Sequence, residues 1–98
     1  MKAKLLIEYR YPISENSFAE MVVWEVPTKV PPSAHNLKYR LAFVVNDICV
    51  LRFDNERGKG DHMHFQGAEI GYEFVDLDKL LKDFDREIRR FRDENSID

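Results

Sequence analysis

The alternation of apolar and polar side chains over residues 37–45 constrains the fold of this chain more than any other feature of its sequence. Apolar residues occupy every second position, namely Leu37, Tyr39, Leu41, Phe43 and Val45. Because successive side chains of an extended chain point to opposite faces, this pattern predicts a β-strand with one buried face. The next two residues, Asn46 and Asp47, tolerate positive φ and predict a two-residue hairpin turn. Residues 48–53 then return as an antiparallel strand.

Three further segments extend this sheet. Residues 5–11 alternate in the same way, and residues 18–26 are rich in residue types that favour strands, with Pro27 at the end. The polar residues 14–17 between them predict a turn, so the two segments form a hairpin. Residues 72–74 are a candidate for a short fifth strand. We therefore expect an antiparallel four- to five-stranded sheet with the connectivity of a β-meander.

A helical pattern occupies residues 77–92. Its apolar residues fall on one stripe at helical spacing: Leu77, Leu80, Leu81, Phe84, Ile88 and Phe91. Asp76 is a suitable N-cap, Asp78 and Lys82 form a supportive pair, and the arginines near the C-terminal end are expected to be a solvated face. The stripe predicts one C-terminal helix packed on one face of the sheet. The fold class is therefore α+β, in a single domain that spans residues 1–98.

Composition narrows the classes of protein to which the chain can belong. Its 98 residues suffice for one domain, and an apolar fraction of 44% predicts a packed core. A net charge of -3 argues against a general basic coat for nucleic acid, but not against a local basic site. Cys49 is the only cysteine, so an intrachain disulfide is excluded. The sequence shows no signal-peptide core and no apolar run of membrane length, and we expect a cytoplasmic protein that does not bind a membrane.

The residues most suggestive of chemistry lie at positions 54–64, which read D-N-E-R-G-K-G-D-H-M-H. Imidazoles, cations and carboxylates are concentrated in this segment, and Gly58 and Gly60 give its backbone additional conformational freedom. If the segment is a strand, His62 and His64 point the same way and are able to converge on one ligand. Loops on a rigid scaffold often carry binding and catalytic groups, so we expect the functional site here.

One interpretation of this segment is metal-free cleavage of RNA. That reaction needs a base for the 2′-hydroxyl, an acid for the leaving oxygen, and cations for the charge that builds on phosphorus. Imidazole suits the first two tasks because its unperturbed pKa is near ~6.5. We expect catalytic groups at His62, His64, Asp61 and Glu56, and substrate-binding groups at Arg57, Lys59, Asn55 and Arg52.

Two other interpretations of the segment remain open. His62 and His64, together with Asp61 or Glu56, offer ligands for a metal ion. Catalytic zinc usually has three protein ligands, however, and His35 lies elsewhere in the chain, so we predict no metal and no cofactor. The segment also suits an ordinary solvated hairpin or loop, and its G-K-G spacing is not that of a phosphate-binding P-loop.

Four segments of the chain together are similar to a known family. They are Lys38-Tyr39-Arg40-Leu41-Ala42-Phe43-Val44, Leu51-Arg52-Phe53-Asp54-Asn55-Glu56, Gly58-Lys59-Gly60-Asp61-His62-x-His64 and Tyr72-x-Phe74, followed by the helical pattern after Asp76. With these motifs the chain resembles the TumE family of bacterial and archaeal toxin components from two-gene toxin–antitoxin modules. Members often carry a basic residue between the two histidines, where this chain has Met63.

The resemblance implies a growth-inhibiting toxin of a type II toxin–antitoxin system, neutralised by a separately encoded antitoxin that typically carries a helix-turn-helix domain. Because many toxins of such modules are endoribonucleases, it favours RNA as the substrate. His62 and His64 would then act as acid and base. A non-catalytic protein-binding module and a metal-dependent nuclease are the alternatives. The edge strand at residues 5–11 would allow two copies to pair as a homodimer.

Overall fold

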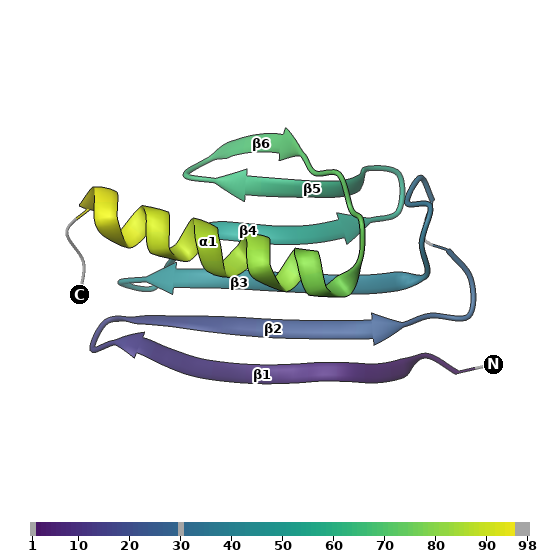
Figure 1. The fold of residues 1–98 in the computed structure, drawn as a ribbon, viewed down its shortest axis with the longest axis horizontal. Coiled ribbons are helices and arrows are strands. Elements are labelled where there is room, and N and C mark those ends of the chain that lie inside the picture. Colours follow the sequence, from purple (N-terminus) through teal and green to yellow (C-terminus); the bar gives the residue numbers. More distant parts are fainter. Residues whose placement is uncertain (1, 30, 96–98) are drawn as a thin grey trace.

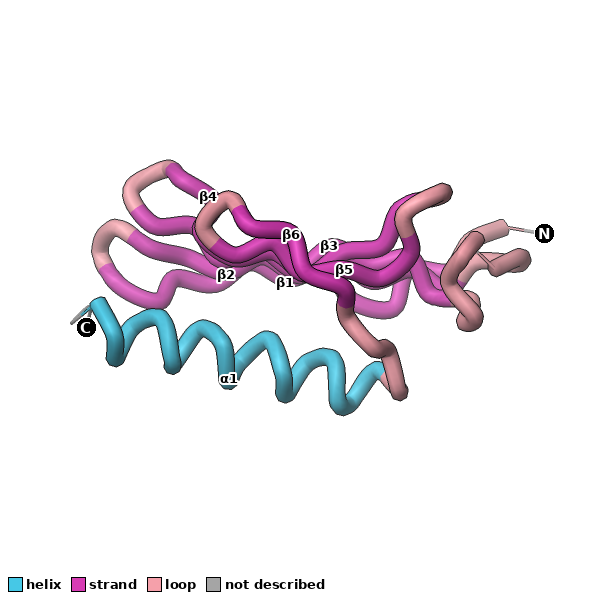
Figure 2. The backbone as a smooth tube through the Cα atoms, turned by 90° about the horizontal axis from the view of Figure 1, so that it is seen from above, coloured by secondary structure: helices cyan, strands magenta, loops and turns pink. Residues whose placement is uncertain are grey.

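Each strand of the sheet pairs with its neighbours in the sequence, so the chain folds as an antiparallel meander. The computed structural model describes residues 2–29 and 31–95. The strands, in their order across the sheet, are β1 (Lys4–Ser14), β2 (Ser17–Glu25), β3 (Leu37–Val45), β4 (Ile48–Glu56), β5 (Gly60–Phe65) and β6 (Ala68–Gly71). Helix α1 (Leu77–Asn95) crosses the sheet on one side (Figure 1). The view in Figure 2 shows that the helix covers one face only, and we call the other face the open face. The α+β class and the single C-terminal helix are thus confirmed.

The sheet has six strands, so the expectation of four to five was wrong. The difference lies in β5 and β6, the first of which lies largely within residues 54–64, where the sequence suggests a loop. Strand β4 continues to Glu56, and β5 begins at Gly60 after a short turn. Gly58 and Gly60 have φ angles of 89° and 77°, which glycine adopts without strain. The two glycines therefore close a tight hairpin, and His62 and His64 lie in a strand.

The expectation of a short strand at residues 72–74 was also wrong, because this segment links β6 to the helix outside any strand, although the N–H of Tyr72 donates a backbone hydrogen bond to the carbonyl of Asp61 at 3.1 Å. Its two aromatic side chains anchor the link instead. The Tyr72 ring meets Phe53 edge-on with centroids 5.1 Å apart. The Phe74 ring stacks on His35 with centroids 3.8 Å apart. The apolar alternation in this segment thus reflects two anchor points rather than a sheet edge.

The predicted turn between β3 and β4 is confirmed. Asn46 and Asp47 both have positive φ, 50° and 65°, and Val45 pairs with Ile48 across the turn. Two consecutive residues with positive φ give a turn whose twist matches that of the flanking strands, which is why this residue pair favours a hairpin.

A bulge then changes the register of β3 and β4 by one residue. Val44 pairs with Cys49, but the next pair is Phe43 with Leu51, so β4 carries one additional residue. Continued without the bulge, the pairing would set apolar residues of β3 opposite charged residues of β4. With it, Leu41 pairs with Phe53, and both lie in the core under the helix. The bulge therefore lets both strands bury their apolar side chains on the same face.

The apolar stripe of α1 forms the other half of the core, as predicted. Leu80, Phe84, Ile88 and Phe91 are buried against the sheet. Edge-on aromatic contacts join the two layers, with centroids of Phe43 and Phe91 5.7 Å apart. The helix begins where expected, because the carboxylate of Asp76 accepts a hydrogen bond from the backbone N–H of Lys79 at 2.8 Å. No described helix is long and apolar enough to cross a membrane.

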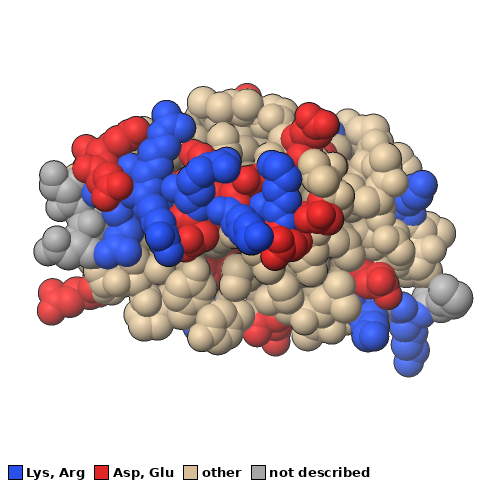
Figure 3. Space-filling model, viewed as in Figure 1, with Lys and Arg blue, Asp and Glu red and all other residues tan. Residues whose placement is uncertain are grey.

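The outer surface of α1 carries basic and acidic side chains in close alternation, as Figure 3 shows. Many of them are paired along the helix: Asp78 with Lys82 at 2.9 Å, Asp85 with Arg89 at 2.9 Å, and Arg90 with Glu94 at 3.1 Å. Because acids partner these cations, the helix surface is a solvated face rather than a basic patch, as expected from the sequence.

Asp83 is a buried carboxylate on α1, and it joins the helix to the link that follows β6. Its Oδ2 atom accepts hydrogen bonds from the Lys79 ammonium at 2.7 Å and from the Tyr72 hydroxyl at 2.6 Å. Arg86 lies 3.0 Å from the other oxygen. Burial by itself acts to raise the pKa of Asp83, but the two hydrogen bonds and the charges of Lys79 and Arg86 outweigh it and lower the pKa.

Replacing Asp83 by Asn is expected to destabilise the protein at neutral pH by about 1–3 kcal/mol, because the ionised acceptor is lost. The folded-state pKa of Asp83 lies below that of the unfolded chain, so its contribution is present at pH values above ~4 and is lost as the pH falls through the folded pKa. Urea unfolding at neutral and at acidic pH measures both effects. The Asp83→Asn variant should lose less stability on acidification than the wild type.

Asp85→Asn is the matched control, because this carboxylate is exposed and pairs with Arg89 along the helix. Its effect on the free energy of unfolding should stay within about 0.5 kcal/mol. The same acid-dependent loss in wild type and Asp83→Asn would contradict the role assigned to the buried carboxylate.

Candidate functional site

Two neighbouring rows of paired residues run across the open face of the sheet, the first over β3, β4 and β5 and the second over β4 and β5. In the first row Arg40 pairs with Asp54 and Asp54 with His62. In the second row Arg52 pairs with His64. Because alternate residues of a strand share a face, all five side chains leave the sheet on the side away from the helix. The bulge in β4 sets this arrangement at the same time as it sets the core.

Four of these side chains form a compact group, which we call the histidine cluster: Arg52, Asp54, His62 and His64. Nε2 of His62 lies 2.7 Å from Oδ1 of Asp54, and Nε of Arg52 lies 3.0 Å from Oδ2 of the same carboxylate. The rings of His62 and His64 meet edge-on with centroids 4.8 Å apart. One carboxylate therefore lies between an imidazole and a guanidinium, with the second imidazole alongside.

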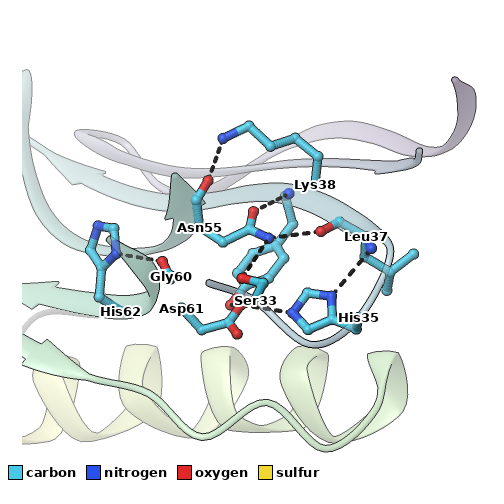
Figure 4. A network of polar contacts seen from close by, with 9 residues as sticks. Ser33, His35, Leu37, Lys38, Asn55, Gly60, Asp61 and His62 are labelled. Atoms are coloured by element: carbon cyan, nitrogen blue, oxygen red, sulfur yellow. Dashed lines mark hydrogen bonds and ion pairs between the residues drawn. The ribbon is translucent and has the colours of Figure 1, made fainter. Parts of the chain in front are cut away.

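The orientation of the His62 ring is fixed by the backbone. Its Nδ1 atom lies 3.0 Å from the carbonyl oxygen of Gly60, which can only accept a hydrogen bond, so Nδ1 carries the proton. In the neutral ring Nε2 then has a free lone pair, and that atom faces Asp54. Figure 4 shows His62 on the opposite side of the strand from the helix. His62 is 3% exposed, so its ring is held inside the protein surface.

Several atoms of the cluster are buried yet lack hydrogen bonds. They are Arg52 Nε, Asp54 Oδ1, His62 Nε2 and His64 Nε2, none of which has a partner with hydrogen-bond geometry in the described part of the chain. The contact between Arg52 and Asp54 is thus an ion pair with poor hydrogen-bond alignment, and the contact between His62 and Asp54 is a close approach of two polar atoms. Buried polar atoms without a partner are costly and uncommon in native proteins, so the cluster is a place where a ligand would be stabilised.

An open hollow of about 590 Å³ lies beside the cluster on the same face. It is lined by Val22, Trp24, Lys38, Tyr39, Arg40, Arg52, Asp54 and Glu56. Arg52 and Asp54 belong both to the hollow and to the cluster. Cations outnumber carboxylates in this lining by three to two, although the chain as a whole is acidic.

Sequence reasoning missed Trp24, Lys38 and Arg40 as members of the site. The alternation of residues 37–45 already places Lys38 and Arg40 on the face opposite the core. Their approach to Asp54, however, depends on the one-residue bulge in β4, which the sequence pattern does not locate. Trp24 comes from β2, and only the register of β2 with β3, in which it pairs with Lys38, brings it to the hollow.

The segment 54–64 does not act as one site, because alternate residues point to opposite sides of the sheet. Figure 4 shows Asp61 on the side of the helix, away from His62. Its Oδ1 atom accepts hydrogen bonds from the Tyr39 hydroxyl at 2.8 Å and from His35 Nε2 at 2.8 Å. Burial, followed by this hydrogen bond, raises the pKa of Tyr39 far above its usual value, so the hydroxyl remains a donor. Asp61 therefore orients His35, not the histidine cluster.

Asn55 is also turned away from the open face, and its side chain is wholly buried. Its amide oxygen accepts a hydrogen bond from the backbone N–H of Tyr39 at 3.0 Å, and its amide nitrogen donates to the carbonyl of Leu37 at 2.7 Å (Figure 4). The same nitrogen lies 3.4 Å from the hydroxyl of Ser33. Asn55 thus holds the proline-rich loop against the start of β3.

The remaining predicted residues lie near the β4–β5 turn. Glu56 lines the hollow on the open face. Arg57 and Lys59 are exposed in the turn itself, and Lys59 lies 3.9 Å from Glu69 of β6. The predicted set is therefore divided among the open face, the helix side of the sheet and the turn.

A family model described as Toxin TumE matches residues 2–92, which is nearly the whole chain. The chain belongs to the TumE toxin family. The match includes both rows of the open face, the hollow and most of the helix. No curated protein and no solved structure gave a match to the chain. Membership in a toxin family supports a toxin role for this TumE-family protein.

Replacing Asn55 by Ala in this TumE-family protein is expected to lower the free energy of unfolding by about 2–4 kcal/mol. The change leaves the backbone N–H of Tyr39 and the carbonyl of Leu37 buried without partners, and each such group costs about 1–3 kcal/mol. Urea unfolding measures the loss as a lower urea concentration at the midpoint, provided that the dependence of the unfolding free energy on urea concentration has the same slope in both proteins. Asn36→Ala is the control, because that side chain is exposed in the same loop. Wild-type stability in Asn55→Ala would show that the amide does not hold the loop.

Proposed function

We propose that this TumE-family protein inhibits growth by cleaving RNA without a metal ion, with the RNA bound across the open face. The observation that carries the proposal is the shared membership of Arg52 and Asp54 in the hollow and in the histidine cluster. A phosphate group held by the cations of the hollow would therefore lie next to the two imidazoles. Charge-assisted hydrogen bonds from arginine and lysine to phosphate oxygens are among the strongest polar contacts in proteins.

The hollow has the residue types that hold single-stranded RNA. Lys38, Arg40 and Arg52 supply positive charge to its wall. Trp24, 36% exposed, offers a flat aromatic surface on which a base is able to stack. A volume of about 590 Å³ is of the size that holds small ligands, and here it fits one nucleotide of a longer strand.

His62 and His64 are the proposed acid–base pair. Because Nδ1 of His62 donates to Gly60, its Nε2 atom is the one that accepts a proton, and Asp54 at 2.7 Å would stabilise the resulting imidazolium. His64 would donate a proton to the leaving oxygen, and Arg52 would stabilise the charge on phosphorus. Nε2 of both rings is buried, so His64, the less buried residue, has to turn toward the hollow when RNA binds.

The other predicted site residues have supporting roles in this proposal. Glu56 lines the hollow and would orient the groups that bind the substrate. Arg57 and Lys59 in the turn would contact the strand further along its backbone. Asn55 and Asp61 act through the scaffold, because their side chains are engaged by Tyr39 and by the residues of the proline-rich loop.

A toxin family suggests an antitoxin partner. We propose that this partner carries a helix-turn-helix domain and that the pair acts in the cytoplasm as a type II system. Pairing of two copies through the exposed edge of β1 is a further proposal, which size measurement of the isolated chain in solution would test.

Expression of the wild-type chain is expected to arrest growth and to fragment cellular RNA, and His64→Gln is expected to abolish both effects. Loss of one acid–base group should lower the cleavage rate by at least ~100-fold. Growth after induction and an RNA gel from the same cultures are the measurements. His35→Gln is the matched control, since that histidine lies on the other side of the sheet beside Asp61.

Circular dichroism and accumulation of each variant show whether it is folded, which separates loss of chemistry from loss of structure. His62→Gln is the second variant, with the same expectation. Growth arrest by a folded His64→Gln and a folded His62→Gln alike would reject the acid–base assignment. It would favour a non-catalytic module that stops growth by binding a protein.

Arg40→Gln is expected to weaken binding of a 2′-O-methyl oligoribonucleotide several-fold. That probe lacks the attacking hydroxyl and so reports binding alone. Loss of one phosphate contact on a single strand should reduce the slope of log affinity against log salt by about 0.7. Fluorescence anisotropy at several salt concentrations measures both quantities. Arg89→Gln, on the outer surface of the helix, should bind as the wild type does, and equal effects of the two changes would contradict binding on the open face.

A further inference from the structure

We infer that Asp54, His62 and His64 form a binding site for one divalent transition-metal ion, for which Zn²⁺ is the probe. Each residue offers one ligand atom, and the three atoms lie within 4.8 Å of one another. A tetrahedral ion with bonds of ~2.1 Å holds its ligands roughly 3.4 Å apart. Small rotations of the side chains would therefore bring the three atoms to ligand positions without any change in the backbone.

One of the two imidazoles already has the orientation of a metal ligand. Nδ1 of His62 donates to the carbonyl oxygen of Gly60 at 3.0 Å, which leaves the Nε2 lone pair directed into the cluster. Histidines that bind metal ions almost always donate their other ring N–H to a backbone carbonyl, a carboxylate or water. The hydrogen bond to Gly60 thus fixes both the tautomer and the direction of the ligand atom.

The cluster also contains buried polar atoms that need a partner. Nε2 of His62, Nε2 of His64 and Oδ1 of Asp54 are all withdrawn from solvent, and none has a hydrogen bond within residues 2–29 and 31–95. His62 and Asp54 are 3% and 6% exposed. These three atoms are the same ones that would bind the ion, so a single metal ion would satisfy all of them at once.

Two carboxylates lie close enough to the imidazoles to hold a cation, and each already has a basic side chain beside it. Arg52 lies behind Asp54, 3.0 Å from the oxygen that does not face His62, and so holds the carboxylate as an outer partner. Glu69 on β6 lies 4.0 Å from Nε2 of His62 and is able to supply a fourth ligand. Lys59 lies 3.9 Å from the same Oε1 atom of Glu69, so Glu69 would exchange this contact for the ion.

The donor set selects the class of ion. Two imidazole nitrogens and one carboxylate oxygen suit zinc and its neighbours in the first transition row, whereas Mg²⁺ and Ca²⁺ prefer sites built from oxygen atoms alone. Zn²⁺ and Co²⁺ should therefore bind, and Mg²⁺ should not.

Ion binding uses the histidines of the proposed function, but it does not depend on RNA cleavage. One consequence rests on the proposed function: an ion on both Nε2 atoms occupies the lone pairs that metal-free acid–base chemistry requires. Zn²⁺ is therefore expected to suppress metal-free cleavage of RNA by this chain, and a chelator to restore it.

The test uses the full chain, purified without a polyhistidine tag and dialysed against a chelator. Calorimetric titration with Zn²⁺ is expected to give one site per chain, and Co²⁺ should give the strong visible absorption of a tetrahedral site. Asp54→Asn and His64→Gln should each weaken Zn²⁺ binding at least about ten-fold. His35→Gln should bind Zn²⁺ as the wild type does, because His35 lies outside the cluster.

The absence of saturable Zn²⁺ binding would overturn the site, as would equal binding by the wild type, Asp54→Asn and His64→Gln. RNA cleavage is measured separately on the same samples, so the two proposals fail independently. If RNA is cleaved in the presence of a chelator and added Zn²⁺ suppresses the cleavage, both the metal-free mechanism and the metal site are supported. Cleavage that requires Zn²⁺ supports the metal site and overturns the metal-free mechanism.

Discussion

Because the side chains of a strand alternate between two faces, the pairing of β3 with β4 arranges the core and the open face in one step. The two-residue turn at Asn46 and Asp47 would by itself set the wrong residues opposite one another, and the bulge in β4 shifts the register by one. Leu41 then meets Phe53 under the helix, while Arg40 meets Asp54 on the other side. Burial of apolar area, the dominant favourable term in folding, thereby also brings the charged groups of the site together.

The two faces of the sheet have opposite surroundings, because the helix covers one and leaves the other open (Figure 2). On its side of the sheet, Phe84, Phe91 and their neighbours exclude water, and even the polar groups there, Asp61 and Asp83, are hydrogen-bonded within the protein. On the open face, polar atoms of Asp54 and His62 are buried without such partners. Proteins tend to carry strain and unsatisfied groups at functional sites, and the contrast between the two faces follows that tendency.

The sequence was sufficient for the fold class, the first four strands, the turn at Asn46 and the helix, because each has a local signal in alternation, turn chemistry or capping. It was insufficient for β5 and β6, where glycines that suggest a loose segment instead close a hairpin. It grouped Arg52, His62 and His64, which the structure places together, with Asn55 and Asp61, which lie on the other side of the sheet. Sequence alone does not separate such neighbours until the face of each residue is known. Trp24 and Arg40 come from β2 and β3, outside the segment 54–64. The bulge that sets the register of β3 and β4 leaves no local pattern in the sequence, so the approach of Arg40 to Asp54 was not predictable.

The position of α1 after all six strands has a consequence for the protein during its synthesis. Every residue of the histidine cluster lies on the β4–β5 hairpin, whose contacts span few residues and so form rapidly. The helix that covers the apolar face of the sheet is made later, and until then Leu41, Phe43 and Phe53 have no cover. The cluster on the open face therefore depends for its stability on a helix that is made after all of its own residues, and until then the uncovered apolar face favours misassembly with other chains.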